Sequence, residues 1–180
     1  TIERASGSPL SADGDLLLHY AIADVGWFVR GGDPLDGEAW RRGTTLYLPD
    51  GKAGLYPPVL AEGAASLLPD GPRPAVVFHV RLNAAGESTL DGAERSLIHS
   101  RAKLAYDTVT AADLPAGFDE FSRRVAAAEV ARGAGNVEPP EQHVHREDGH
   151  YRLTFRPRLP SEDQNAAMSL AANLAVAGAM

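Results

Sequence analysis

The stretch LLLHYAIADVGWFV, residues 16–29, is a dense run of aliphatic, β-branched and aromatic residues. A run of this kind that follows a polar, glycine-containing lead-in is typical of a buried strand. Asp24 and Gly26 interrupt the run, which predicts a bulge or turn at the end of the strand. Asp24 could be a displaced metal ligand. Because a buried carboxylate needs hydrogen-bond partners, we instead expect backbone N–H groups at the bulge to hold it.

Two β-hairpins are predicted further along the chain. Val76, Phe78, Val80 and Leu82 alternate with other residues, and a short loop at 83–86 leads into a returning strand. The second hairpin lies in QHVHREDGHYRLTFRP, residues 142–157, where an Asp-Gly pair between two strands is a strong turn signal. The segment TTLYLPD, residues 44–50, predicts a further short strand.

Three helices are predicted. LDGEAWRRG, residues 35–43, has its acids early, its arginines late and a glycine at its end. In residues 118–133 one apolar stripe faces the core; it consists of Phe118, Phe121, Val125 and Ala128. The last helix begins near Glu162, after a capping box of Ser161 and Gln164. Its apolar residues, Met168, Leu170, Leu174 and Val176, suggest packing partners outside this chain.

The segments between these elements are less regular. Residues 55–74 contain five prolines, each lacking a backbone donor, so we expect an ordered meander over the core. Residues 100–109 predict a strand end that turns into a helix. The elements together predict an α+β fold with a mixed or antiparallel sheet, hairpins and packed helices, in a single domain covering 1–180.

Composition excludes several classes of function. The chain has 180 residues, 44% hydrophobic, with 24 acidic and 17 basic side chains and a net charge of −7. This charge disfavours binding of nucleic acid through bulk attraction, so such a partner would require a local basic patch or a metal. The absence of cysteine excludes disulfides and thiol catalysis and fits a cytoplasmic location. No apolar run reaches the roughly 18 residues of a membrane span, so no membrane partner is expected.

Four ordered blocks resemble the catalytic (RNB) domain of the ribonuclease II/R family of exoribonucleases. They are HYAIADVGWFV (19–29), GDPLDGEAWRRGTTLYLPDG (32–51), LYPPVLAEGAASLLPDGPRPAVVFHVRLNAAGE (55–87) and SRAKLAYDTV (100–109). The similarity continues more weakly through GNVEPPEQHV (135–144) and LPSEDQNAAMSLAANLA (159–175). The resemblance implies that the chain is the N-terminal portion of an RNB domain.

The resemblance also implies a reaction and a cofactor. Enzymes of this family hydrolyse single-stranded RNA from its 3′ end to nucleoside monophosphates, with Mg²⁺ held by a cluster of aspartates. In the family a T-I-D motif and a D-x-D-D or D-x-D-Q motif precede the block that here begins with His19. This chain has Thr1-Ile2-Glu3 there, followed only by Asp13 and Asp15. Glu3 is therefore the candidate that the resemblance leaves as a ligand of this Mg²⁺, and the chain alone is expected to be inactive.

Four residues are candidates for RNA binding, two of them by the same resemblance. In the family, tyrosines at the positions of Tyr47 and Tyr106 contact RNA near its 3′ end. Any base can stack on an aromatic ring, which suits a sequence-tolerant nuclease. Arg101 and Lys103 flank Tyr106 and could meet phosphates. Without the resemblance, a tyrosine in a strand is more often a packing residue.

Alternative interpretations stay open at the level of sequence. The chain could be a degenerate RNB module that binds RNA or a protein partner without cleavage, or a scaffold for oligomerisation. His143, His145 and His150 could form a metal site, although a solvent-facing polar strand is favoured. The sequence AWRRG, residues 39–43, could clamp a phosphate, or its arginines could simply favour a helix end.

Overall fold

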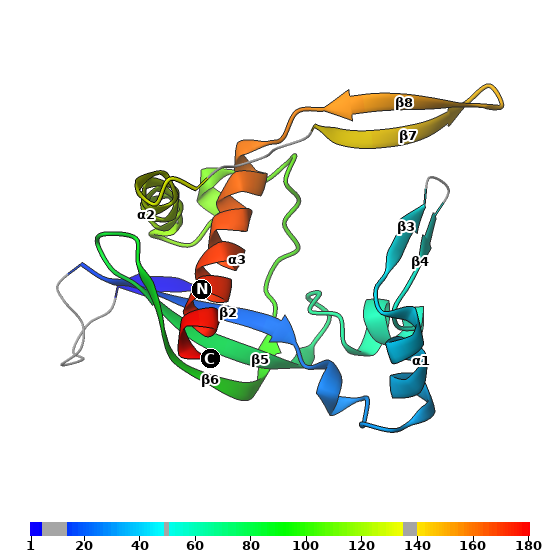
Figure 1. The fold of residues 1–180 in the computed structure, drawn as a ribbon, viewed down its shortest axis with the longest axis horizontal. Coiled ribbons are helices and arrows are strands. Elements are labelled where there is room, and N and C mark those ends of the chain that lie inside the picture. Colours follow the sequence, from blue (N-terminus) through cyan, green and yellow to red (C-terminus); the bar gives the residue numbers. More distant parts are fainter. Residues whose placement is uncertain (5–13, 49–50, 135–139) are drawn as a thin grey trace.

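A four-stranded antiparallel sheet lies at the centre of the structure (Figure 1). The computed structural model describes residues 1–4, 14–48, 51–134 and 140–180. The sheet has the order β1-β2-β5-β6, and its strands are β1 (Ile2–Arg4), β2 (Leu16–Ala23), β5 (Pro72–Leu82) and β6 (Ser88–His99). The buried run at the start of the chain thus forms an inner strand, and the predicted α+β class with an antiparallel sheet is confirmed.

The β5–β6 hairpin turns where the sequence predicts, at residues 83–86. The Asn83 side-chain oxygen accepts hydrogen bonds from the backbone N–H groups of Ala85 and Glu87, each at 2.9 Å. Gly86 has a φ of +80°, and a Cβ atom there would lie 2.3 Å from the carbonyl oxygen of Arg124. Glycine is therefore required for both the backbone conformation and the close contact with the neighbouring helix.

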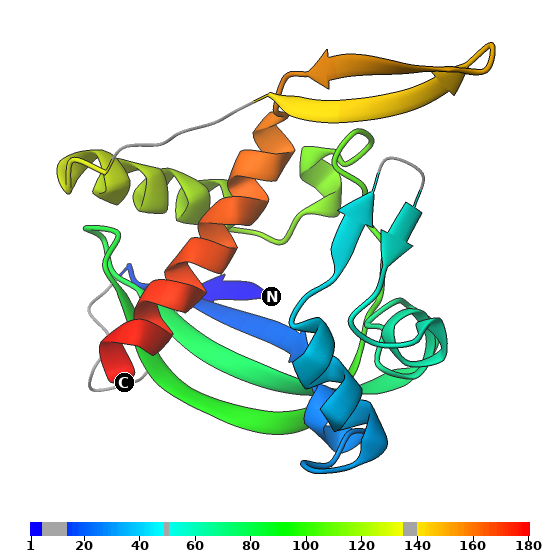
Figure 2. The same cartoon turned by 45° about the vertical axis from the view of Figure 1, so that its right-hand side comes forward.

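Two helices cover one face of this sheet: α2 (Phe118–Ala131) and α3 (Pro160–Ala179) (Figures 1 and 2). Alternation along the strands directs Ile2, Leu16, Leu18, Val80 and Leu82 toward the helices. The predicted stripe of α2 is buried as expected, and Phe121 at its centre is completely inaccessible to solvent. These residues form one apolar core with α3.

Helix α3 packs through small residues, which differs from the sequence-based expectation. Its buried positions are Ala167, Ala171, Ala172 and Ala175. Alanines let a helix backbone approach the sheet closely, and Met168 and Leu170 pack against the same core. Packing partners of α3 outside this chain stay a prediction. Leu174, one of the predicted contact residues, is 40% exposed.

The start of α3 also differs from the prediction. Leu159 is the N-cap residue, and its backbone N–H donates to the Glu162 carboxylate at 2.6 Å. Ser161 lies inside the first turn and donates to the backbone oxygen of Tyr106 at 2.7 Å. The predicted capping box of Ser161 and Gln164 was therefore wrong, because a tertiary contact recruits the serine hydroxyl.

A smaller group of elements extends beyond the end of β2 (Figure 2). It contains a 3₁₀ turn (Val25–Trp27), α1 (Pro34–Arg42), β3 (Leu46–Leu48) and β4 (Gly51–Ala53). Helix α1 is capped by Asp33, which accepts from the N–H of Asp36, and it ends at Gly43 as predicted. The proline-containing segment is not wholly irregular: Val59–Ala64 forms a π-helical turn, closed by a hydrogen bond from Ala65 N–H to Leu60 O.

The second predicted hairpin is also present, as β7 (Glu141–Glu147) and β8 (His150–Arg156). Its turn residues Asp148 and Gly149 both have positive φ, which matches an Asp-Gly hairpin turn. Both views show this hairpin projecting past the N-terminal end of α3 (Figures 1 and 2). Residues 100–109 lack the predicted helix and contain a turn at 106–108. None of the helices in the described ranges has the length and hydropathy that a membrane crossing needs.

Candidate functional site

Tyr106 is held in place by the first turns of α3. The side-chain amide of Asn165 donates to the Tyr106 phenol oxygen at 3.0 Å, and Ser161 donates to the Tyr106 backbone oxygen at 2.7 Å. Ser161 and Asn165 are four residues apart and so lie on one side of the helix. The ring remains 49% exposed. The structure therefore fixes the position of the ring while leaving part of it accessible.

Tyr106 lines a cavity of about 340 Å³ at the junction of the 104–118 segment and α3. The lining combines apolar side chains with the tyrosine and the amide group; it includes Leu104, Tyr106, Val109, Phe118, Asn165 and Met168. Such a site can receive a flat, partly apolar ring and orient it with a few polar groups. Sequence reasoning did not assign Ser161 and Asn165 to this site, because their spacing places them on one side of a helix and does not indicate a partner at Tyr106.

Arg101 and Lys103 lie just before Tyr106, and both side chains are exposed. No ion pair or hydrogen bond of either side chain is found within the part of the chain that the structure describes. Both cations are therefore available to an external anion. Their contact with phosphates stays a prediction.

Tyr47 lies on β3 and is 82% exposed. It lines a different cavity, of about 740 Å³, which also receives Arg42 and Lys52. These two cations have local partners: Arg42 pairs with Glu38 and donates to the Gly54 carbonyl, and Lys52 pairs with Glu62 at 2.6 Å. A hydrogen bond with Glu62 raises the pKa of Lys52. Tyr47 and Tyr106 thus belong to two separate cavities.

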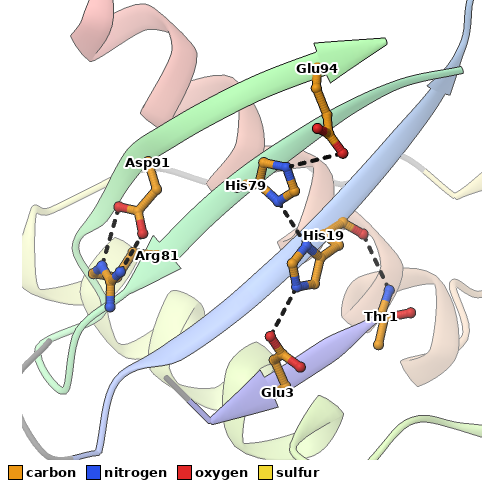
Figure 3. Close-up of polar contacts among 7 residues, drawn as sticks. All are labelled: Thr1, Glu3, His19, His79, Arg81, Asp91 and Glu94. Atoms are coloured by element: carbon orange, nitrogen blue, oxygen red, sulfur yellow. Dashed lines mark hydrogen bonds and ion pairs between the residues drawn. The ribbon is translucent and has the colours of Figure 1, made fainter. Parts of the chain in front are cut away.

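Glu3 lies on the face of the sheet opposite α2 and α3, in a row of side chains that crosses four strands (Figure 3). Its Oε1 atom is 3.2 Å from His19 Nε2, and His19 Nδ1 is 2.8 Å from His79 Nδ1. His79 Nε2 in turn lies 3.9 Å from Glu94 Oε1. The contact between the two Nδ1 atoms holds one proton, because one nitrogen must donate and the other accept. The row therefore ties the edge strand β1 to the sheet.

The described residues do not provide a metal centre. Glu3 is engaged by His19, and Arg81 donates to Asp91 (Figure 3). The buried Asp15 lies 3.9 Å from Arg81. Across residues 1–4, 14–48, 51–134 and 140–180, no group of three or more His, Cys, Asp or Glu side chains is placed to hold a metal ion. Asp13 lies outside the described residues. The donor set present does not fit the magnesium site that the resemblance implies, and the role of Glu3 stays a prediction.

Asp24 is a structural residue, with a main partner that differs from the expected one. It is buried at the end of β2, and Arg95 on β6 donates to it through Nε at 2.6 Å and Nη2 at 3.0 Å. This bidentate pair is the main compensation for burial of the carboxylate, and the backbone N–H of Trp27 adds the kind of contact that the sequence predicts. The hydrogen bonds from Arg95 lower the pKa of Asp24 below its ordinary value.

We expect Asp24→Asn to reduce the loss of folding stability that occurs as the pH falls. A carboxyl group whose folded-state pKa is lowered stabilises the fold above its unfolded-state pKa of about 3.9, and this contribution is lost as the pH falls through the folded-state pKa. The wild-type chain should therefore lose more stability than the variant between about pH 5 and 2. Melting temperatures measured across this range test the prediction, with Asp107→Asn as an exposed control. Parallel curves for wild type and Asp24→Asn would contradict it.

Two weaker candidates have local roles. His143 and His145 share one face of β7, with ring centroids 6.0 Å apart and planes at 9°, which agrees with the predicted alternation. His150, on the same face of the hairpin, does not complete a metal site with them in the described part of the chain. Arg41 and Arg42 both pair with Glu38, so their main contacts are within α1.

Comparison with known proteins places these features in one family. The family model described as "RNB domain" matches residues 4–179. Ribonuclease R of Vibrio parahaemolyticus is 34% identical over 99 residues, which cover 55% of this chain and 12% of that protein. Exoribonuclease 2 of Photorhabdus laumondii is 39% identical over 99 residues, covering 54% of this chain and 15% of that protein.

Solved structures show the same fold. Mycoplasma genitalium RNase R in complex with ribose methylated single-stranded RNA superimposes with a TM-score of 0.81 at 20% identity, covering 96% of this chain and 28% of that one. The Dss1 exoribonuclease from Candida glabrata gives a TM-score of 0.72 at 17% identity, covering 98% of this chain and 26% of that one. This chain thus corresponds to a small part of each relative. Because the family model spans nearly every residue, this chain belongs to the RNB domain family.

Proposed function

We propose that this chain binds single-stranded RNA as part of a 3′-to-5′ exoribonuclease that releases nucleoside monophosphates. The observation that carries the proposal is the match of residues 4–179 to the RNB domain. The similar proteins named Ribonuclease R and Exoribonuclease 2, and a similar structure that contains single-stranded RNA, support it. We also propose a cytoplasmic location, with which the absence of cysteine is compatible.

The Tyr106 cavity supplies a binding mode for the RNA. A base can stack on the exposed part of the Tyr106 ring, and the apolar lining excludes water from the stacked face. Asn165 and Ser161 keep the ring from rotating away, so less conformational entropy is lost on binding. Arg101 and Lys103 lie beside the ring in sequence and can contact the phosphates that precede that base.

For the complete enzyme we propose Mg²⁺ as the cofactor, since hard cations prefer carboxylate oxygens and RNA phosphates. The described residues do not hold such an ion, and we assign no step of the reaction to them beyond RNA binding. The chain of 180 residues should therefore bind RNA without releasing mononucleotides.

Fluorescence anisotropy with a labelled single-stranded RNA tests the proposal directly. We expect the chain to bind this RNA more tightly than a duplex of equal length, with affinity that falls as salt rises. When Mg²⁺ is added, the chain alone should release no mononucleotides from this RNA. Failure to bind single-stranded RNA at low salt would overturn the proposed function, and mononucleotide release would overturn the statement about the metal.

A further inference from the structure

The β7–β8 hairpin exposes an aromatic and aliphatic face. Cross-strand pairing places Tyr151 opposite Arg146, Leu153 opposite Val144 and Phe155 opposite Gln142, so all six side chains share one face. Tyr151 is 61% exposed and Phe155 is 59% exposed. We call these six residues the hairpin face; they are Gln142, Val144, Arg146, Tyr151, Leu153 and Phe155.

The hairpin face has an energetic reason to be covered. A two-stranded hairpin is only marginally stable in water, and large exposed apolar side chains add unfavourable hydration. The hairpin is anchored at its base, where Arg156 donates to the Glu162 carboxylate of α3 at 2.7 Å. Figures 1 and 2 show its strands extending away from the sheet beyond this anchor. A contiguous apolar patch on such a projection is typical of a binding surface.

We propose that the hairpin face is a second platform for single-stranded RNA, outside the Tyr106 cavity. The charge on the face favours a polyanion, because Arg146 is its only charged side chain although the chain as a whole carries a net charge of −7. Glu147 points to the opposite face, where it pairs with Arg152. Within the described ranges Arg146 has no ion-pair partner and is exposed. A cation beside exposed aromatic rings is a common arrangement in proteins that bind single strands.

The spacing of the two exposed rings on the hairpin face suits an extended single strand. Tyr151 and Phe155 are four residues apart on one strand, which separates them by about 13 Å. They can therefore stack on two different bases of an extended strand. The hairpin leads directly into α3, whose first turns hold Tyr106 through Ser161 and Asn165. This inference rests on the proposed function, since it extends the path of the same RNA.

Binding of RNAs of two lengths to the 180-residue chain tests the inference. We choose labelled oligouridines of about 4 and about 16 nucleotides, which bracket common single-strand site sizes. The double variant Tyr151→Ala/Phe155→Ala should bind the longer RNA about tenfold or more weakly, because two stacking surfaces are lost, and should bind the shorter RNA as the wild type does. The control, His150→Ala/Thr154→Ala, changes the opposite face of the same strand and should leave both affinities unchanged.

A second variant tests whether the positive charge of Arg146 contacts a phosphate. Arg146→Gln should reduce the slope of log K against log salt for the longer RNA by about 0.7, which corresponds to one phosphate contact on a single strand. The variants change exposed side chains except at Thr154, which is half-buried and donates to the backbone oxygen of His143. Melting temperatures within about 2 °C of wild type would show that all of them are folded.

The outcomes separate this inference from the proposed function. Equal binding of the longer RNA by the hairpin double variant and its control would overturn the inference, while weaker binding by Tyr106→Ala would still support the proposed function. If the wild-type chain binds neither RNA, both are overturned. A concentration-dependent dimer in sedimentation experiments that is lost in Tyr151→Ala/Phe155→Ala would assign the face to a second copy of the chain and overturn RNA as its occupant.

Discussion

Replacing Phe121 with alanine is expected to lower the free energy of unfolding by about 3–5 kcal/mol, because truncation of a fully buried aromatic side chain removes apolar burial and leaves a cavity. Phe121 has no exposed surface and lies in the core that joins α2, α3 and the central sheet. The total stability of a domain is usually only about 5–15 kcal/mol, so this single change removes a large fraction of it.

Urea denaturation of the wild-type and Phe121→Ala chains measures this effect. The matched control is Val130→Ala on the same helix, since Val130 is 81% exposed and its truncation should change stability by no more than about 0.5 kcal/mol. A similar small change for both variants would contradict the packing of α2 against the sheet.

Replacing Tyr106 with alanine is expected to weaken binding of single-stranded RNA by about 1–3 kcal/mol, or roughly fivefold to 150-fold, if one base stacks on the ring. The ring is half exposed beside a cavity, so its removal should leave the core packing largely intact. Anisotropy titrations with the short oligouridine measure the loss, and the melting temperature confirms that the variant is folded.

Two further variants separate stacking from positioning. Tyr106→Phe keeps the ring and removes only the hydrogen bond from Asn165, so it should retain most of the affinity. Asn165→Ala removes the donor of the same hydrogen bond, so its effect on RNA affinity should be similar in size to that of Tyr106→Phe. If Tyr106→Phe binds as weakly as Tyr106→Ala, the hydroxyl and not the ring is the important group, and base stacking at Tyr106 is contradicted.

The sequence allowed prediction of the elements whose signals are local. Asp148 and Gly149 identified the second hairpin because an Asp-Gly turn accepts positive φ at both positions. The stripe of α2 identified its buried face because helical periodicity and burial coincide there. The family resemblance, carried by ordered blocks of sequence, is confirmed by the match over residues 4–179.

The candidate site was predicted less completely. Tyr47 and Tyr106 came from the family resemblance, and Arg101 and Lys103 from their place beside Tyr106. Contact of all four with RNA stays a prediction. No local signal indicated that Asn165, which is 59 residues from Tyr106, would bond to its hydroxyl. Ser161 was assigned to a helix cap because its own sequence neighbourhood resembles one, whereas its actual partner is the Tyr106 carbonyl. The prediction was wrong because a tertiary contact replaced a local one.

By itself, the sequence determined the family, through ordered blocks of residues along the chain. It also determined the class of fold, both hairpin turns and the buried face of α2, because turn chemistry and hydrophobic periodicity act over a few neighbouring residues. Only the tertiary structure decided that Asp24 pairs with Arg95, 71 residues away, and that Glu3 joins the row through His19 to His79 and Glu94. These contacts depend on strand order and register across the whole sheet. Such long-range pairings are set by the packing of distant segments, and a single sequence carries no local pattern that specifies them.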